Sequence, residues 1–193
     1  MIVMMTEQPI FRFLQSLILV AVWALTSSGA LAKSSQILVV GDSISAGYGL
    51  SSGEGWGDLL TKKLGEEKIP AQVINASISG DTTAGGLSRL PALLAKHRPT
   101  HVVIELGGND GLRGSPVAKT KANLLNIAEL SNASGAKVFL LGMQLPTNFC
   151  PNYTAQIETM YSHLSHSYTS DIVSTLFGTI ATDLSHFHLA RIN

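Results

Sequence analysis

The 193-residue chain has little charge, a single cysteine and no excess of either sign of charge. Only 13% of its residues are charged, and 13 Lys and Arg balance 13 Asp and Glu, so the formal net charge is zero. Nucleic-acid binders and proteins of anionic membrane surfaces need clustered positive charge, so both classes are excluded. The lone Cys150 excludes an intramolecular disulfide framework and any metal site built from several thiolates.

The apolar run near the N-terminus is too short to cross a membrane. Residues 13–25 follow Arg12 and precede the small residues 30–32 (Ala-Leu-Ala). This order is typical of a secretory signal peptide, whereas a membrane-spanning helix needs about 20 apolar residues. We therefore predict a signal peptide at 1–32, cut after Ala32, and a periplasmic or secreted mature domain at 33–193 without stable membrane insertion. An uncleaved membrane anchor is the alternative.

Short β-branched runs alternate with segments of helical spacing through about residue 143. Strands are predicted at residues 36–40, 71–75, 101–105 and 137–141, with a weaker fifth strand at 172–177. A helix is predicted near 153–168. Three apolar stripes indicate amphipathic helices between the strands, at Trp56, Leu59, Leu60 and Leu64, at Leu87, Leu90, Leu93 and Leu94, and at Leu124, Leu125, Ile127 and Leu130. This alternation is typical of an α/β domain with a parallel sheet.

Polar loops that contain glycine follow the first three predicted strands. They cover residues 41–48, 77–82 and 107–111. Any one of them could be an ordinary turn, because Gly, Asp, Ser and Asn are common turn residues. In a parallel sheet, however, ligands bind at the carboxyl ends of the strands. The three loops therefore predict one shared site.

Three short blocks in these loops resemble the SGNH (GDSL) hydrolases, a family of esterases and lipases. The blocks are Gly-Asp-Ser at 41–43, Ser-Gly-Asp-Thr at 79–82 and Gly-Gly-Asn-Asp at 107–110. Residues 75–82 and 105–114 are very similar to the branch of bacterial periplasmic thioesterases, lysophospholipases and arylesterases. The resemblance implies a three-layer, flavodoxin-like fold and a monomeric serine hydrolase of small acyl esters or thioesters, without cofactor or metal.

The same resemblance assigns roles to residues of the three blocks. Ser43 corresponds to the nucleophile, which attacks the carbonyl and forms an acyl-enzyme. Its backbone N–H, that of Gly80 and the side-chain amide of Asn109 correspond to the oxyanion hole, where donors stabilise the developing negative charge. We expect Asp42 and Asp110 to brace loops and take no part in catalysis.

The base of the triad comes from a fourth block in the family. The family places an Asp-x-x-His block near its C-terminus, and the matching residues here are Asp183 and His186, which lack the usual neighbouring Gly and Pro. Two interpretations stay open. Either a shortened loop brings Asp183 and His186 to Ser43, or the C-terminal block is altered by a frameshift or truncation and the closing helix is lost. In the second case the domain is a catalytically impaired remnant that binds acyl or glycan ligands.

The other histidines and the cysteine suggest no separate chemistry. His163 and His166 lie three residues apart on a predicted helix, but no third ligand has suitable spacing, so no metal site is predicted. Cys150 lies in a loop where neither a histidine nor a helix N-terminus is evident that could activate the thiol. We interpret it as an incidental thiol.

Overall fold

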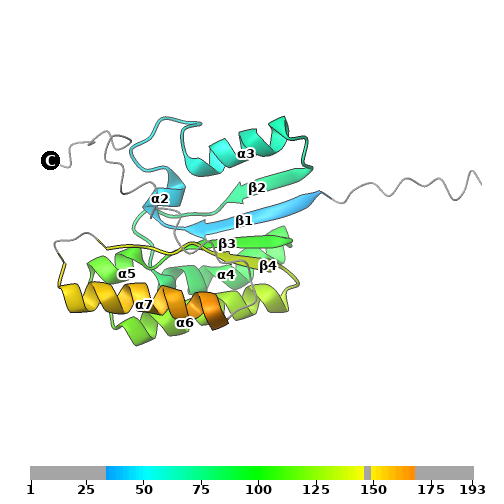
Figure 1. Ribbon diagram of the computed structural model, residues 1–193. Coiled ribbons are helices and arrows are strands. Elements are labelled where there is room, and N and C mark those ends of the chain that lie inside the picture. The colour runs from blue at the N-terminus through cyan, green and yellow to red at the C-terminus, as the bar shows by residue number, and fades with distance from the viewer. Residues whose placement is uncertain (1–33, 146–148, 168–193) are drawn as a thin grey trace, which may run out of the picture. The chain divides into compact units, whose positions relative to one another are not determined.

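The computed structural model describes residues 34–145 and 149–167, which form a parallel sheet flanked by helices (Figure 1). The strands are β1 (Ser35–Gly41), β2 (Ala71–Asn75), β3 (His101–Glu105) and β4 (Lys137–Leu140). They are hydrogen-bonded in the order β2-β1-β3-β4, and every pair is parallel. The helices are α2 (Ser43–Ala46), α3 (Trp56–Glu66), α4 (Thr83–His97), α5 (Gly108–Leu112), α6 (Val117–Ala133) and α7 (Pro151–Ser167).

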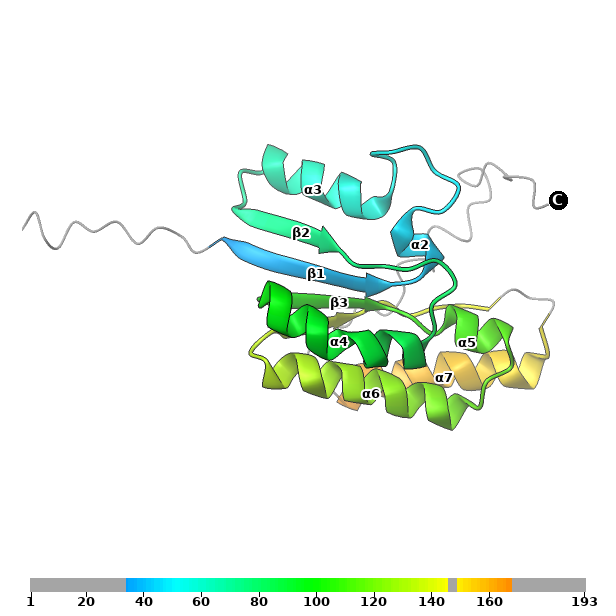
Figure 2. The ribbon, with the colours of Figure 1, turned by 180° about the vertical axis from the view of Figure 1, so that it is seen from behind.

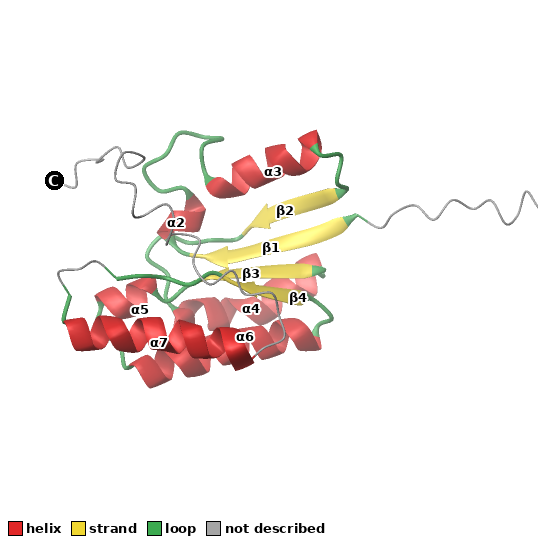
Figure 3. Ribbon diagram, viewed as in Figure 1, coloured by secondary structure: helices red, strands yellow, loops and turns green. Residues whose placement is uncertain are grey.

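Side chains that alternate along the strands divide the core between the two faces of the sheet. Leu38 and Val40 point to one face, where residues of α4, α6 and α7 complete the larger core. Val39 points to the other face and packs in a smaller cluster with Trp56 of α3. Figures 2 and 3 show α4, α6 and α7 together on one side and α3 on the other. The predicted three-layer α/β fold is confirmed.

The predicted secondary structure agrees closely with the observed elements. Two strands have the predicted bounds, β1 is longer by one residue at each end, and β4 is shorter by one residue at its end. Gly135, just beyond α6, has φ +88°, a left-handed conformation that glycine tolerates at a helix end. The predicted strand at 172–177 and the expected loss of a closing helix both concern residues outside the described part of the chain.

Two leucines were wrongly included in the predicted apolar stripes. Leu59 is 53% exposed and Leu130 is 41% exposed. Successive helical residues are about 100° apart around the axis, so Leu130 lies about 120° away from the buried Leu124. The inner face of α6 instead includes the small polar residues Thr120 and Ser131. Leu59 lies about 100° from the half-buried Leu60, at the solvent side of α3.

A groove of about 510 Å³ lies between α3 and the sheet. Its lining includes Ser35, Ala71 and His101, which are the first residues of their strands. The groove therefore reaches toward the amino ends of the strands, away from the loops that carry the polar blocks. Within the described residues, no helix is both long enough and apolar enough to span a bilayer.

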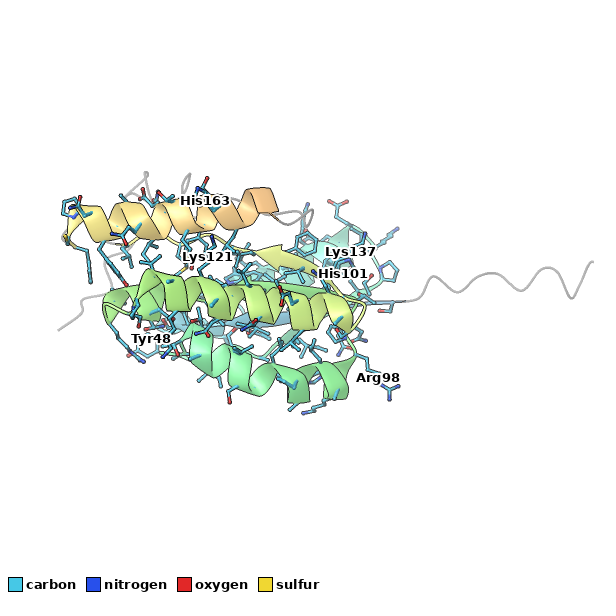
Figure 4. The ribbon with its side chains drawn as sticks, turned by 90° about the horizontal axis from the view of Figure 1, so that it is seen from below. Tyr48, Arg98, His101, Lys121, Lys137 and His163 are labelled. Atoms are coloured by element: carbon cyan, nitrogen blue, oxygen red, sulfur yellow. The ribbon has the colours of Figure 1, made fainter. Side chains whose placement is uncertain are left out.

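The order of the strands reverses at β1 and β3, because the chain passes from β1 outward to β2 and then back across to β3. Connections on either side of such a point diverge, which leaves room for a ligand at the carboxyl ends of the strands. The loops that follow β1 and β3 both begin at these carboxyl ends. In Figure 4, Tyr48 of the first loop lies at the opposite end of the domain from Arg98, His101 and Lys137.

Candidate active site

Ser43 begins a four-residue helix directly after β1. Asp42 is the N-cap of this helix, and its Oδ1 accepts a hydrogen bond of 3.1 Å from the backbone N–H of Ile44. Gly47 ends the helix with φ +73°, a conformation that favours glycine. A strand that leads into a tight, capped turn places Ser43 at the edge of the sheet with its side chain only partly buried.

Gly80 lies in a turn that packs against the end of β1. The N–H of Asp81 donates to the carbonyl of Ile78 at 3.0 Å and closes a four-residue turn, and Gly80 occupies its third position with φ +78°. This position of the turn favours glycine, since other residues are strained there. The N–H of Ile78 also donates to the carbonyl of Gly41 at 3.0 Å. The second block is thereby tied to the strand that carries Ser43.

Asn109 links the first two blocks through its side chain. Its Nδ2 donates to Oδ2 of Asp42 at 3.0 Å and to the carbonyl of Asp81 at 2.9 Å. Because both partners are acceptors, the NH₂ group must face them, and the orientation of the amide is fixed. These acceptors are the immediate neighbours of Ser43 and Gly80 in the sequence. The three residues predicted to act together are therefore linked through hydrogen bonds to these neighbours.

The two aspartates that were expected to brace loops do so. Asp110 is 4% exposed, and its carboxylate accepts from the N–H of Thr83 at 2.8 Å and from the Thr83 hydroxyl at 2.6 Å. This pairing holds the start of α4 against α5. Asp42 caps α2 and receives the Asn109 amide, as described above. The predicted structural role of both residues is confirmed.

Arg89 of α4 was not singled out from the sequence, yet it connects three segments at the site. Its Nε pairs with Oδ2 of Asp81 at 2.9 Å, its Nη1 donates to the carbonyl of Ala76, and its Nη2 donates to the carbonyl of Gly41 at 3.4 Å. The planar guanidinium can hold several acceptors in a fixed geometry. It therefore fixes the loop after β2 against the end of β1.

Glu105, the last residue of β3, was also missed. It is 0% exposed, and it accepts hydrogen bonds from the segment on either side of Ser43. Burial, aided by the nearby Asp42 carboxylate, raises the pKa of Glu105 to about 7. Burial also raises the pKa of Asp42, although hydrogen bonds from Ile44 and Asn109 oppose the shift. Negative charge at this edge of the sheet favours the protonated form of any imidazole that comes near.

Several residues named in the sequence analysis lie outside the three loops. The structure does not describe Asp183 and His186, and it does not describe the side chain of His166. Cys150 is exposed and directly precedes α7, and its carbonyl accepts from the N–H groups of Tyr153 and Thr154, so the expectation that no helix N-terminus lies near it was wrong. Within residues 34–145 and 149–167, no three His, Cys, Asp or Glu side chains are grouped so that they could hold a metal ion.

Comparison with known proteins identifies the family. The model of the GDSL-like lipase/acylhydrolase family matches residues 39–179, which include all three blocks. The chain belongs to this family. The GDSL-like hydrolase is 51% identical over 148 residues to esterase TesA of Pseudomonas aeruginosa, covering 77% of this chain and 74% of the relative.

Two further relatives agree with this assignment. The GDSL-like hydrolase is 41% identical over 137 residues to thioesterase 1/protease 1/lysophospholipase L1 of Escherichia coli K12, covering 71% of this chain and 64% of that protein. Its fold matches the crystal structure of AlinE4, an SGNH-hydrolase family esterase, with a TM-score of 0.77 and 34% identity, over 85% of this chain and 88% of the other. The protein is therefore a hydrolase of ester bonds with the SGNH fold.

Proposed function

We propose that this hydrolase cleaves acyl esters and thioesters through an acyl-enzyme on Ser43. The oxyanion of the tetrahedral intermediate is held by the backbone N–H groups of Ser43 and Gly80 and by the Asn109 amide. One observation carries the proposal: the Asn109 side chain bonds to the neighbours of both other residues. To donate to the oxyanion, one Asn109 N–H shares its proton between its protein acceptor and the substrate oxygen.

Exposed apolar side chains on the same loops support an acyl substrate. Exposed apolar side chains that gather in one region mark binding sites, whereas single scattered ones are ordinary. Five large apolar side chains, each between 38% and 80% exposed, come from the segments that follow β1, β2 and β3: Ile44, Tyr48, Leu50, Ile78 and Leu112. An acyl chain of the substrate would cover part of this apolar rim.

We expect hydrolysis of p-nitrophenyl esters to become more efficient as the acyl chain lengthens. Full burial of a CH₂ group is worth about 0.8 kcal/mol, but this rim stays partly open, so kcat/KM should rise about twofold per CH₂ from acetate to hexanoate. Leu50→Ser should reduce this rise of kcat/KM with acyl chain length. Leu59→Ser, an equally exposed leucine on α3, serves as the control and should leave it unchanged. A rate that is flat or falls with chain length in the wild type contradicts the apolar rim, and no hydrolysis at all contradicts the proposed function.

Removal of the Asn109 amide should slow the chemical step and barely affect binding. We expect Asn109→Ala to lower kcat about 10²- to 10³-fold, as is typical of an oxyanion donor, with KM within about twofold. The measurement is steady-state kinetics on p-nitrophenyl butyrate. Asn132→Ala, an exposed asparagine in the last turn of α6, is the matched control. A fall in kcat below tenfold with intact folding would remove Asn109 from the oxyanion hole.

We further propose that the protein is exported. Arg12, the apolar run at 13–25 that follows it and the Ala-Leu-Ala at 30–32 support a signal peptide that ends at Ala32. Export would leave 33–193 as a single hydrolase domain in the periplasm or outside the cell.

A further inference from the structure

Residues 42–45, the turn that carries Ser43 and is called the nucleophile turn below, are hydrogen-bonded to a buried carboxylate that takes no part in the ester chemistry. Oε2 of Glu105 accepts hydrogen bonds from the N–H of Asp42 at 3.3 Å, the N–H of Ser45 at 3.2 Å and the Ser45 hydroxyl at 2.6 Å. These donors come from both sides of Ser43. The carboxylate therefore fixes the position of the residue before the nucleophile and of the residue two places after it.

A second layer of contacts leaves this arrangement little freedom. The Nε1 of Trp56 can only donate, and it does so to the Ser45 hydroxyl oxygen at 3.1 Å. The hydroxyl proton is thereby directed to Glu105. A Cβ at Gly41 would lie 2.6 Å from the Ser45 hydroxyl oxygen and 2.8 Å from Oε2 of Glu105, so only glycine fits at the end of β1. Because these groups are closely packed, any displacement of the Glu105 carboxylate would also displace the nucleophile turn.

We propose that Glu105 is a positioning residue for Ser43: its carboxylate, bonded to Asp42 and Ser45, holds the nucleophile turn in the reactive geometry only while it is ionised. This inference rests on the proposed role of Ser43. A hydrogen bond to an ionised acceptor is roughly twice as strong as one to a neutral acceptor. Protonation therefore loosens all three bonds together, and Ser43 shifts relative to the oxyanion donors.

The surroundings of Glu105 place this protonation in the neutral range of pH. Burial and the Asp42 carboxylate raise the pKa of Glu105 to about 7, and its Oε1 is buried without a partner among the described residues. The Tyr161 hydroxyl of α7, kept neutral by burial, instead donates to the carbonyl of Leu106 at 2.6 Å. Asp110 of α5 adds negative charge beside Asp42, and the guanidinium of Arg89 donates to the carbonyl of Gly41 on this side. Among residues 34–145 and 149–167, the ionised carboxylate of Glu105 thus has no direct counter-ion.

Because its pKa is raised, ionisation of Glu105 lowers the free energy of unfolding of the chain. Since the pKa of Glu105 is higher in the folded chain than the ordinary value of 4.5, this group stabilises the fold most below about pH 4.5. That contribution is lost as the pH rises through about 7. A buried acid that destabilises the fold in its charged form, placed beside a nucleophile, is typical of a functional site.

The test compares wild type with Glu105→Gln, in which the side chain keeps its shape and stays neutral at every pH. At pH 8.5 we expect the variant to have a kcat about 10- to 100-fold lower, with KM within about twofold, because a misplaced nucleophile affects the chemistry and not the binding. At pH 5.5 the two proteins should differ by less than threefold. Glu66→Gln, an exposed glutamate of α3, is the matched control and should follow wild type at both pH values.

A second readout is independent of activity. In the full-length chain with Trp23→Phe, Trp56 is the remaining tryptophan, and its indole contacts the hydroxyl that is bonded to Glu105. We expect its fluorescence emission to titrate with a midpoint near pH 7, and Glu105→Gln to abolish the transition. If Glu105→Gln fails to fold, Ser45→Ala removes one of the three bonds and should reduce kcat at pH 8.5 by a smaller factor.

The outcomes separate this inference from the proposed function. If wild type is active and Glu105→Gln keeps its kcat and its Trp56 transition at all pH values, Glu105 is structural only and the inference is wrong. An inactive wild type with a normal Trp56 transition instead contradicts the proposed function, and the positioning role with it.

Discussion

Replacement of Ser43 by alanine should abolish ester hydrolysis. Loss of the nucleophile in a serine hydrolase costs about 10⁶-fold in kcat, so we expect turnover of p-nitrophenyl butyrate to fall to the level that the oxyanion hole and binding alone can supply. Stability should change little, since the Ser43 side chain is only partly buried and the cap of α2 comes from Asp42. The measurements are kcat and the thermal midpoint of the same preparation.

Two controls make this result specific. Ser52→Ala replaces an exposed serine of the loop that follows α2 and should leave kcat unchanged. A fluorophosphonate probe should label wild type and Ser52→Ala but not Ser43→Ala, because labelling needs an activated hydroxyl. If Ser43→Ala retains more than a hundredth of the wild-type kcat, another residue is the nucleophile and the proposed mechanism is wrong.

The fold and three site residues could be predicted because their signals are local. Runs such as residues 37–40 are apolar and mostly β-branched, so strand propensity and burial both favour a strand there. The loops after the strands carry Ser43, Gly80 and Asn109 at positions where parallel strands end together. The local pattern of residues therefore predicts both the parallel sheet and the end of the sheet at which the three loops meet.

The supporting contacts could not be predicted because their partners are distant in sequence. Glu105 bonds to residues 60 and 63 positions earlier, and Arg89 reaches Gly41 across 48 positions. One signal was nevertheless present. The run His-Val-Val-Ile-Glu at 101–105 ends in a charged residue where a buried strand should end in an apolar one. A buried charge needs partners, so Glu105 could have been marked as a residue with a specific role.

Leu59 and Leu130 show the limit of counting apolar residues. Each lies three residues after an apolar residue of its stripe, Trp56 for Leu59 and Ile127 for Leu130, yet each is exposed. The width of the buried face of a helix depends on what packs against it. On α6 the small residues Thr120 and Ser131 are fully buried, so close approach to its neighbours matters more there than hydrophobicity.

We propose His186 as the base of the triad, and the second large effect is expected there. A serine hydroxyl is a weak nucleophile without a base, and Asp183, three residues earlier, could orient the imidazole. We expect His186→Ala to lower kcat about 10⁶-fold and Asp183→Asn about 10⁴-fold, measured on p-nitrophenyl butyrate. The double variant Ser43→Ala/His186→Ala should be no slower than Ser43→Ala alone, because residues of a triad act as a unit.

His188→Ala is the matched control for His186, since it removes a histidine two residues away, and it should stay within threefold of wild type. Added imidazole should restore part of the activity of His186→Ala, because the lost function is proton transfer and the space left by the side chain admits the free base. If His188→Ala is the inactive variant, the base is His188. If neither substitution matters, the C-terminal block supplies no base, and wild type should then hydrolyse esters only about 10³- to 10⁴-fold faster than water, the residual that an oxyanion hole and binding provide on their own.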